Sequence, residues 1–163
     1  DITGMISPEA LSVVAESNCA VCVMHMQGEP GTMQQAPQYQ NVVAEVRSFL
    51  TDAVERCRQA GIADQRIVVD PGFGFGKTLN HNLDLFSALT VAGVGELPIL
   101  VGLSRKSMLG VITGRPVVER LAGSVAAALL AAQKGAKILR VHDVAATRDA
   151  LAVWAAIEQR EQE

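Results

Sequence analysis

The stretch RIVVDPGFGFGK, Arg66–Lys77, decides the fold class of this chain. Its β-branched run Ile67–Val69 is typical of a short buried strand, and the glycines after Asp70 indicate a turn. Three similar runs complete a set of four predicted strands: Val21–Met26, Arg66–Asp70, Pro98–Ser104 and Ile138–Val144. Each run precedes a longer helical segment. This alternation predicts an α/β fold in which parallel strands alternate with helices.

The helical segments carry apolar residues at three- and four-residue spacing. After the first strand, we expect a helix that ends at Gly61 and buries Val43, Val46, Leu50, Ala53, Val54 and Cys57. Nearer the start, Ser7 and Pro8 are typical of the N-cap and first residue of a helix reaching about Ser17. Residues 1–4 are then expected to be the tail of a further strand.

Two more helices are predicted after the third and fourth strands. One begins near Pro116, ends at Gly135 and uses Leu121, Val125, Ala128 and Leu129 as its apolar positions. The other, Ala145 to about Gln159, is expected to bury Leu151, Trp154 and Ile157. A doubly wound sheet and half of a (β/α)₈ barrel both fit this order. Both folds place ligands at the carboxyl ends of their strands.

Composition excludes several classes of function. The 163 residues are 49% hydrophobic with a formal charge of -3, and the longest basic run is Arg105-Lys106, which disfavours nucleic acid and acidic membranes as partners. The strongly apolar stretch 125–132 is shorter than the roughly 20 residues of a membrane span. We expect no signal peptide. Three cysteines without secretory features favour reduced thiols and a cytoplasmic location.

Cys19 and Cys22 form a C-x-x-C, which can indicate a redox or metal site. Cys22, however, lies within a predicted buried strand rather than at a helix N-terminus. We therefore interpret both cysteines as core residues.

Each predicted strand becomes polar at its carboxyl end. Because side chains alternate along a strand, Gly102, Ser104 and Lys106 are expected to share one face, as are Arg140 and His142. Charged groups inside an otherwise apolar strand are costly to bury unless they meet a partner or an anion. This pair therefore predicts an anion site.

Other polar residues carry weaker signals. Lys77 is interpreted as a solvated loop charge, His25 as a core histidine with its hydrogen bonds satisfied, and His81 as part of a helix start. No two histidines have the spacing of metal ligands on one helix. Gly76-Lys77-Thr78 ends like a P-loop, but Pro71 stands where that motif needs a glycine, which disfavours nucleotide hydrolysis.

In this order, the strand-end segments resemble those of dihydropteroate synthase, the folate-pathway enzyme that sulfonamides inhibit. The segments that carry the resemblance are Met24–Met26, Asp70–Lys77, Gly102–Met108, Glu119–Ser124 and Arg140–Val144. The resemblance covers nearly the whole chain. It implies a (β/α)₈ TIM barrel, with residues 1–163 forming the C-terminal half of one pterin-binding barrel domain and the N-terminal half absent.

The resemblance also implies a transferase reaction and a set of site residues. The family joins 7,8-dihydropterin-6-ylmethyl diphosphate to p-aminobenzoate and expels diphosphate with help from Mg²⁺. The expected catalytic residues are Asp70, Lys106, Arg140 and His142. Pterin would contact Met24, Asp70, Gly102, Lys106 and Arg140; p-aminobenzoate would contact Phe75, Lys106 and Ser107; diphosphate would contact Arg140 and His142.

For metal and partners, the resemblance implies that the Mg²⁺-linked Asn lies in the N-terminal half, leaving no metal ligand in this chain. Its expected partners are the two substrates and either that half or a second copy of this chain, in a homodimer. The chain alone is expected to be inactive. Two alternatives stay open: a pterin-dependent methyltransferase, which needs neither Ser107 as a carboxylate anchor nor Arg140 with His142 at a diphosphate, and a non-catalytic ligand-binding fragment.

Overall fold

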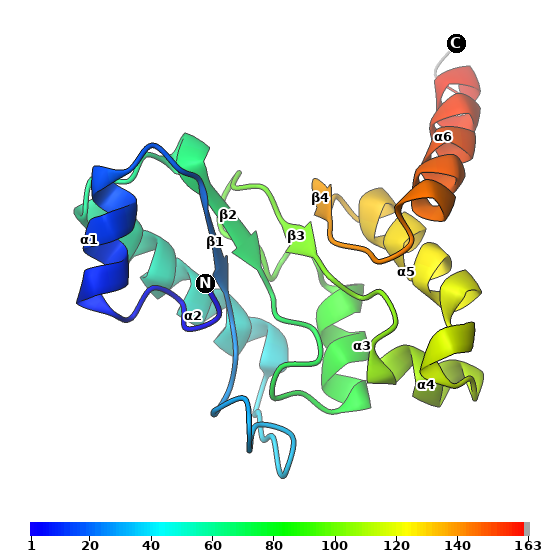
Figure 1. Cartoon of the computed structure of the whole chain (residues 1–163), viewed down its shortest axis with the longest axis horizontal. Coiled ribbons are helices and arrows are strands. Elements are labelled where there is room, and N and C mark those ends of the chain that lie inside the picture. The colour runs from blue at the N-terminus through cyan, green and yellow to red at the C-terminus, as the bar shows by residue number, and fades with distance from the viewer. Residues whose placement is uncertain (162–163) are drawn as a thin grey trace.

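A computed structural model describes residues 1–161 as a curved layer of parallel strands with helices packed along it (Figure 1). The strands are β1 (Val21–Met24), β2 (Ile67–Asp70), β3 (Leu100–Val101) and β4 (Ile138–Leu139). β1 pairs with β2 and β3 pairs with β4, both in parallel. A parallel bridge between Val69 and Ile99 joins the two pairs. The expected alternation of parallel strands and helices is confirmed.

Six α-helices and two short 3₁₀ turns connect the strands within residues 1–161. The helices are α1 (Pro8–Glu16), α2 (Val42–Gln59), α3 (Leu79–Ser87), α4 (Ser107–Thr113), α5 (Leu121–Gln133) and α6 (Val144–Glu161). The 3₁₀ turns are η1 (Asp64–Arg66) and η2 (Val117–Glu119). No helix among these residues is long and apolar enough to cross a membrane.

The predicted start of α1 and end of α2 are confirmed. The Ser7 side chain accepts a hydrogen bond from the N–H of Ala10, and Pro8 is the first helical residue. Gly61 follows α2 with φ at +83°, a backbone conformation that glycine adopts without strain. All the apolar positions predicted for α2 are buried except Val43, which is half-buried. This face of α2 therefore forms part of the core beside β1 and β2.

All four strands are shorter than predicted, β2 by one residue because Arg66 lies in η1. Ladder hydrogen bonding of β3 covers only Leu100–Val101, and β4 ends at Leu139 because the chain turns and enters α6 at Val144. β1 stops at Met24, before the long loop to α2. The predicted strand at the front is present only as backbone pairing: the N–H of Met24 donates to the carbonyl of Asp1 at 3.1 Å.

Some predictions about burial were wrong. Leu121 is 46% exposed and Ile157 is 55% exposed, and Leu151 and Trp154 are half-buried. Figure 1 shows why for α6, which extends away from the strands and packs mainly against α5 within residues 1–161. Cys19 is exposed rather than in the core because β1 begins only at Val21, whereas Cys22 is half-buried in β1.

Candidate functional site

Asp70 occupies the carboxyl end of β2, directly opposite Met24 in the register with β1. Only 3% of the residue is exposed, and its Oδ1 accepts a hydrogen bond of 2.8 Å from the N–H of Gly72. Burial raises the pKa of Asp70 above its ordinary value, whereas the Gly72 N–H and the charges of Lys106, Arg140 and Lys77 act in the opposite direction. The strand end thus presents a desolvated carboxyl group among cations.

Two glycines allow the loop after Asp70 to lie against the end of β1. Gly72 has a φ of +72°, and a Cβ there would lie 1.8 Å from the carbonyl oxygen of His25. Gly76 has a φ of +63°, and its Cβ would lie 2.3 Å from the carbonyl oxygen of Gln27. No residue with a side chain fits either position without moving backbone. The glycine-rich sequence is therefore a steric requirement of this corner.

Lys106, the N-cap of α4, extends from the end of β3 toward the loop after β2. Its ammonium donates to the carbonyl of Phe73 and lies 4.6 Å from the centroid of the Phe75 ring. Burial, with a further contribution from Arg140, lowers the pKa of Lys106 to about 8, although Asp70 acts to raise it. Lys106 therefore keeps its positive charge at neutral pH and connects the ends of β2 and β3.

Arg140 follows β4, and its guanidinium lies against Gly102. A Cβ on Gly102 would be 3.1 Å from both Nε and Nη2 of Arg140, tighter than an ordinary contact. His142 lies nearby, with its Nδ1 2.9 Å from Oγ of Ser104. A hollow of about 260 Å³ is lined by Gly102, Ser104, Lys106, Arg140, Val141 and His142. The predicted shared faces of β3 and β4 are thus brought together.

The expected burial of Arg140 and His142 was wrong, because both residues are exposed. β4 ends before them, and no strand among residues 1–161 lies on its outer side. Their charge can therefore meet solvent or an anion. The desolvation cost that motivated the anion-site prediction is absent, whereas the convergence of the two donors remains.

A second group of side chains holds the backbone of Lys106 in place. Arg105 has a positive φ of +59°, which is uncommon outside glycine, and its guanidinium contacts Asp143 at 2.7 and 3.1 Å. Ser124 Oγ accepts from the N–H of Arg105 at 2.9 Å. Arg120 donates to the carbonyl of Arg105 at 3.0 Å and to that of Lys106. The segment Glu119–Ser124 thus holds in place the turn that positions Lys106.

Lys77 is the clearest error of the sequence interpretation, which placed it in solvent. It is only 3% exposed, and its Nζ donates to the carbonyls of Gly72 and Phe75 at 2.9 and 3.1 Å. The same Nζ lies 2.8 Å from Nδ1 of His25. His25 is 5% exposed, so its interpretation as a core histidine is confirmed, and the contact with Lys77 gives one of its ring nitrogens a partner.

Ser107, which the resemblance assigns to p-aminobenzoate, is the first residue of α4, but it is exposed and does not line the hollow. Sequence reasoning also missed Tyr39, Gln34 and Asn82, which bond the backbone of the loop after β2. Tyr39 and Gln34 lie in a segment without helical or strand periodicity. Only the run of glycines, whose backbone needs partners from elsewhere, hinted at such donors.

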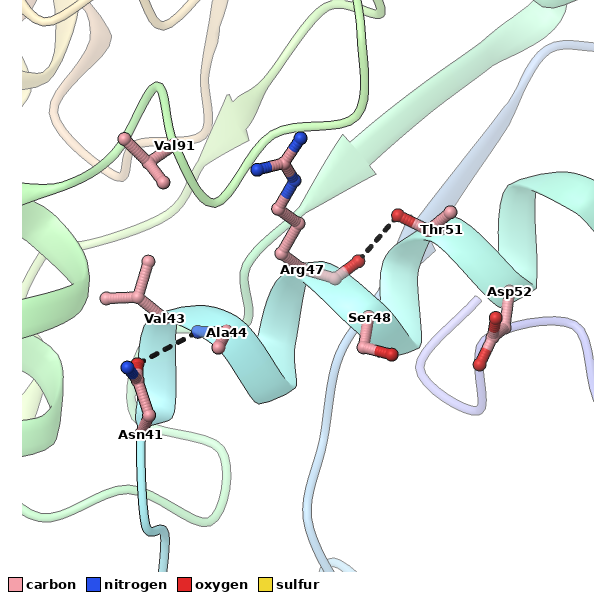
Figure 2. A pocket seen from close by; sticks show the side chains of 8 residues that line it. All are labelled: Asn41, Val43, Ala44, Arg47, Ser48, Thr51, Asp52 and Val91. Atoms are coloured by element: carbon pink, nitrogen blue, oxygen red, sulfur yellow. Dashed lines mark hydrogen bonds between the residues drawn. The ribbon is translucent and has the colours of Figure 1, made fainter.

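No group of three or more His, Cys, Asp or Glu within residues 1–161 could hold a metal ion. A separate hollow of about 430 Å³ lies on the outer face of α2, with Val91 on its far side (Figure 2). Two of its polar groups bond the helix itself: Asn41 accepts from the N–H of Ala44 at 3.0 Å, and Thr51 donates to the carbonyl of Arg47 at 2.8 Å. That surface does not compete with the strand ends as a candidate site.

Comparison with known proteins gives a consistent result. The profile of the family described as "Pterin binding enzyme" matches residues 1–142. Dihydropteroate synthase of Escherichia coli (strain K12) is 50% identical over 153 residues, which cover 94% of this chain and 54% of that protein. The chain spans about half the length of the curated relatives it matches.

Two solved structures closely match the fold. Dihydropteroate synthase from Stenotrophomonas maltophilia, with imidazole bound in its active site, has a TM-score of 0.93 and 50% identity, covering 97% of this chain and 60% of that one. Dihydropteroate synthase from Burkholderia cenocepacia, complexed with 7,8-dihydropteroate, has a TM-score of 0.93 and 49% identity, covering 99% and 61%. Both are TIM barrels, so the chain has the fold of part of a (β/α)₈ barrel.

Proposed function

The chain belongs to the family of pterin-binding enzymes, and we propose that the carboxyl ends of its strands form part of the active site of a dihydropteroate synthase. The observation that carries this proposal is the convergence of Asp70, Lys106 and Arg140 at the ends of three neighbouring strands. Several relatives named dihydropteroate synthase are about half identical to the chain along nearly its whole length. The relative complexed with 7,8-dihydropteroate supports a pterin as the ligand of this chain.

In the proposed reaction, the amine nitrogen of p-aminobenzoate forms a C–N bond to the methylene of 7,8-dihydropterin-6-ylmethyl diphosphate. The C–O bond to diphosphate breaks, its electron pair leaves with diphosphate, and the nitrogen then releases a proton. No covalent enzyme intermediate is required. The residues of this chain need only orient the two substrates and stabilise the charges that develop.

Asp70 is proposed to accept hydrogen bonds from the donor edge of the pterin. Its buried position excludes competing water, and its negative charge favours the electron-poor methylene that develops as diphosphate leaves. Met24, opposite Asp70 in the sheet, would shape the pterin slot, and Gly102 would admit the ring beside Arg140. Arg140 would stack on the pterin through its guanidinium plane.

The anionic groups of the substrates are proposed to bind near the cationic side chains of the site. Arg140 and His142 are proposed to face diphosphate, which their exposure leaves accessible. Lys106 would donate to the pterin ring and border p-aminobenzoate, because its ammonium lies over Phe75, the residue proposed to cover the aminobenzoate ring. Ser107 would hold the aminobenzoate carboxylate through its hydroxyl group. Arg105 and Asp143 act indirectly, by holding the turn before Lys106.

Mg²⁺ in the complete enzyme is proposed to bind residues of the N-terminal half, because the described residues offer no cluster of ligands that fits a divalent cation. An eight-stranded barrel needs strands besides the four described, from the N-terminal half of the barrel or from a second copy. A homodimer is supported by exposed apolar side chains on and near α4 to α6, including Val111, Val118 and Val153. Three free cysteines support a cytoplasmic location.

The proposal is tested by turnover in the full-length protein. Purified enzyme incubated with 7,8-dihydropterin-6-ylmethyl diphosphate and p-aminobenzoate should release diphosphate and 7,8-dihydropteroate in equal amounts. Omitting p-aminobenzoate should abolish diphosphate release. Diphosphate released without 7,8-dihydropteroate, or no reaction by well-folded protein, would contradict the assignment. Light scattering on the same sample tests the homodimer, which a monomer at micromolar concentration would rule out.

A further inference from the structure

The loop between β2 and α3 is held by an unusual set of donors. Each of the five carbonyls from Gly72 to Gly76 accepts a hydrogen bond from a side chain. Lys77 serves the carbonyls of Gly72 and Phe75, and Lys106 serves that of Phe73. Two residues of the β1–α2 loop serve the others: Gln34 bonds the carbonyl of Gly74 and Tyr39 that of Gly76. A segment without ladder partners thereby acquires a defined conformation.

Lys77 is the donor that bonds this loop twice and the end of β1 once. A lysine ammonium has three N–H groups, and the three acceptors around Lys77 match them: Gly72 O, Phe75 O and His25 Nδ1. Burial, followed by the charge of Lys77, lowers the pKa of His25 to about 3. His25 is therefore neutral, with Nδ1 accepting and the ring proton on Nε2.

A buried ammonium at this point costs more than a solvated one. Desolvation of a charged group costs several kcal/mol in proteins even after relaxation. Two other charged groups act on it: Asp70 favours the ammonium, whereas Lys106 opposes it. Burial, with the charge of Lys106, lowers the pKa of Lys77 to about 7 although Asp70 acts to raise it, so the charge persists only up to about neutral pH. An apolar side chain would fill the space without this cost, but it could not bond the loop.

We propose that Lys77 is a positioning residue that ties the β2–α3 loop to the end of β1 and thereby places Asp70 and Phe75. The link to Asp70 is short: Lys77 bonds the carbonyl of Gly72, and the N–H of Gly72 bonds the Asp70 carboxyl. The link to Phe75 is direct, through that residue's own carbonyl. The effect on catalysis rests on the proposed synthase function, whereas the effect on the loop does not.

The test compares Lys77→Met with Lys137→Met in the full-length protein. Methionine is an unbranched side chain one atom shorter than lysine, and it donates no hydrogen bond. Lys137 is exposed and lies just before β4, at the opposite end of the strand from the site, so its variant controls for loss of a lysine. Two quantities are measured: amide hydrogen exchange across residues 71–78 and across α2, and the separate KM and kcat values for p-aminobenzoate.

For Lys77→Met, we expect exchange in 71–78 to accelerate by about tenfold or more while α2 stays protected. The KM for p-aminobenzoate should rise about tenfold, since Phe75 loses its fixed place, with a smaller change in kcat. Lys137→Met should match the parent in both readouts. Unchanged exchange in 71–78, or equal acceleration in the loop and α2, would overturn the positioning role.

Failure of the proposed function gives a different pattern. If the parent forms no 7,8-dihydropteroate, the synthase assignment fails, and the exchange comparison alone decides the role of Lys77. If Lys77→Met does not fold, exchange is measured in His25→Phe, which removes the acceptor of Lys77 at the end of β1 and keeps Lys77 itself. Exchange in 71–78 should then accelerate while α2 stays protected. Unchanged exchange in 71–78 would refute the proposal.

Discussion

Replacing Gly72 by alanine tests whether the loop after β2 must touch the end of β1. The new Cβ would begin 1.8 Å from the carbonyl oxygen of His25, whereas real Cβ contacts essentially never fall below 3.0 Å. The backbone at Gly72 or at His25 must therefore move. Either movement disturbs the hydrogen bond from the Gly72 N–H to the Asp70 carboxyl.

The loss of unfolding free energy expected for Gly72→Ala has two parts. The left-handed backbone at Gly72, φ +72°, costs an alanine about 1 to 2 kcal/mol. Forcing atoms into a packed site adds about 1 to 3 kcal/mol. Gly61→Ala provides a matched control because its φ is +83° but no atom lies within 4 Å of the new Cβ. We therefore expect Gly61→Ala to lose about 1 to 2 kcal/mol of unfolding free energy and Gly72→Ala about 2 to 5 kcal/mol.

Urea unfolding of both variants, in the full-length protein, measures these losses, and pterin binding reports on the site. Gly72→Ala should weaken pterin binding because Asp70 loses its fixed orientation, whereas Gly61→Ala should bind like the parent. Equal losses of stability in the two variants would refute the steric reasoning. If Gly72→Ala bound pterin as tightly as the parent, pterin binding by Asp70 would not depend on the position of the loop.

Three further predictions concern charge. Asp70→Asn should lower kcat on the order of 10²- to 10³-fold with an unchanged circular dichroism spectrum, and activity within threefold of the parent would remove Asp70 from the mechanism. Arg140→Ala should weaken diphosphate binding at least about tenfold by calorimetry, whereas equal affinity would make Arg140 structural. Burial lowers the pKa of Lys77 and Lys106 to about 7 and 8, so the unfolded chain binds more protons above pH 7 and unfolding free energy should rise from pH 7 toward 10.5. Lys77→Met should reduce that slope, and an identical slope would indicate that Lys77 keeps an ordinary pKa.

The fold was largely predictable because its signal is periodic. Apolar spacing located α2, and Ser7 with Pro8 located the start of α1, since those residue types satisfy the first N–H groups of a helix. Strand ends were less predictable. Leu103 and Val141 continue an alternation of apolar and polar residues beyond Val101 and Leu139, but the chain turns away there, and sequence period does not report where pairing stops.

The polar members of the site were predictable for a related reason. Parallel strands bring their carboxyl ends to the same edge of a sheet, so Asp70, Lys106 and Arg140 could be grouped before any coordinates were known. Exposure was not predictable in the same way. Whether Arg140 and His142 are buried depends on which segments lie beside β4, and nothing within those residues encodes that neighbour.

Lys77 was misinterpreted because a sequence does not show which backbone carbonyl groups lack hydrogen-bond partners. Every residue carries a carbonyl group, so the letters of GFGFG do not reveal that these carbonyls lie where ladder partners and water are both scarce. Three glycines at positive φ make the segment compact and press it against β1, and that compactness creates the demand for donors. A lysine next to such a segment can meet that demand from inside the loop, because one ammonium donates to two carbonyls and a histidine together. Glycine-rich turns that bear a catalytic carboxylate are therefore places where an adjacent lysine should first be considered as part of the loop's internal hydrogen bonding.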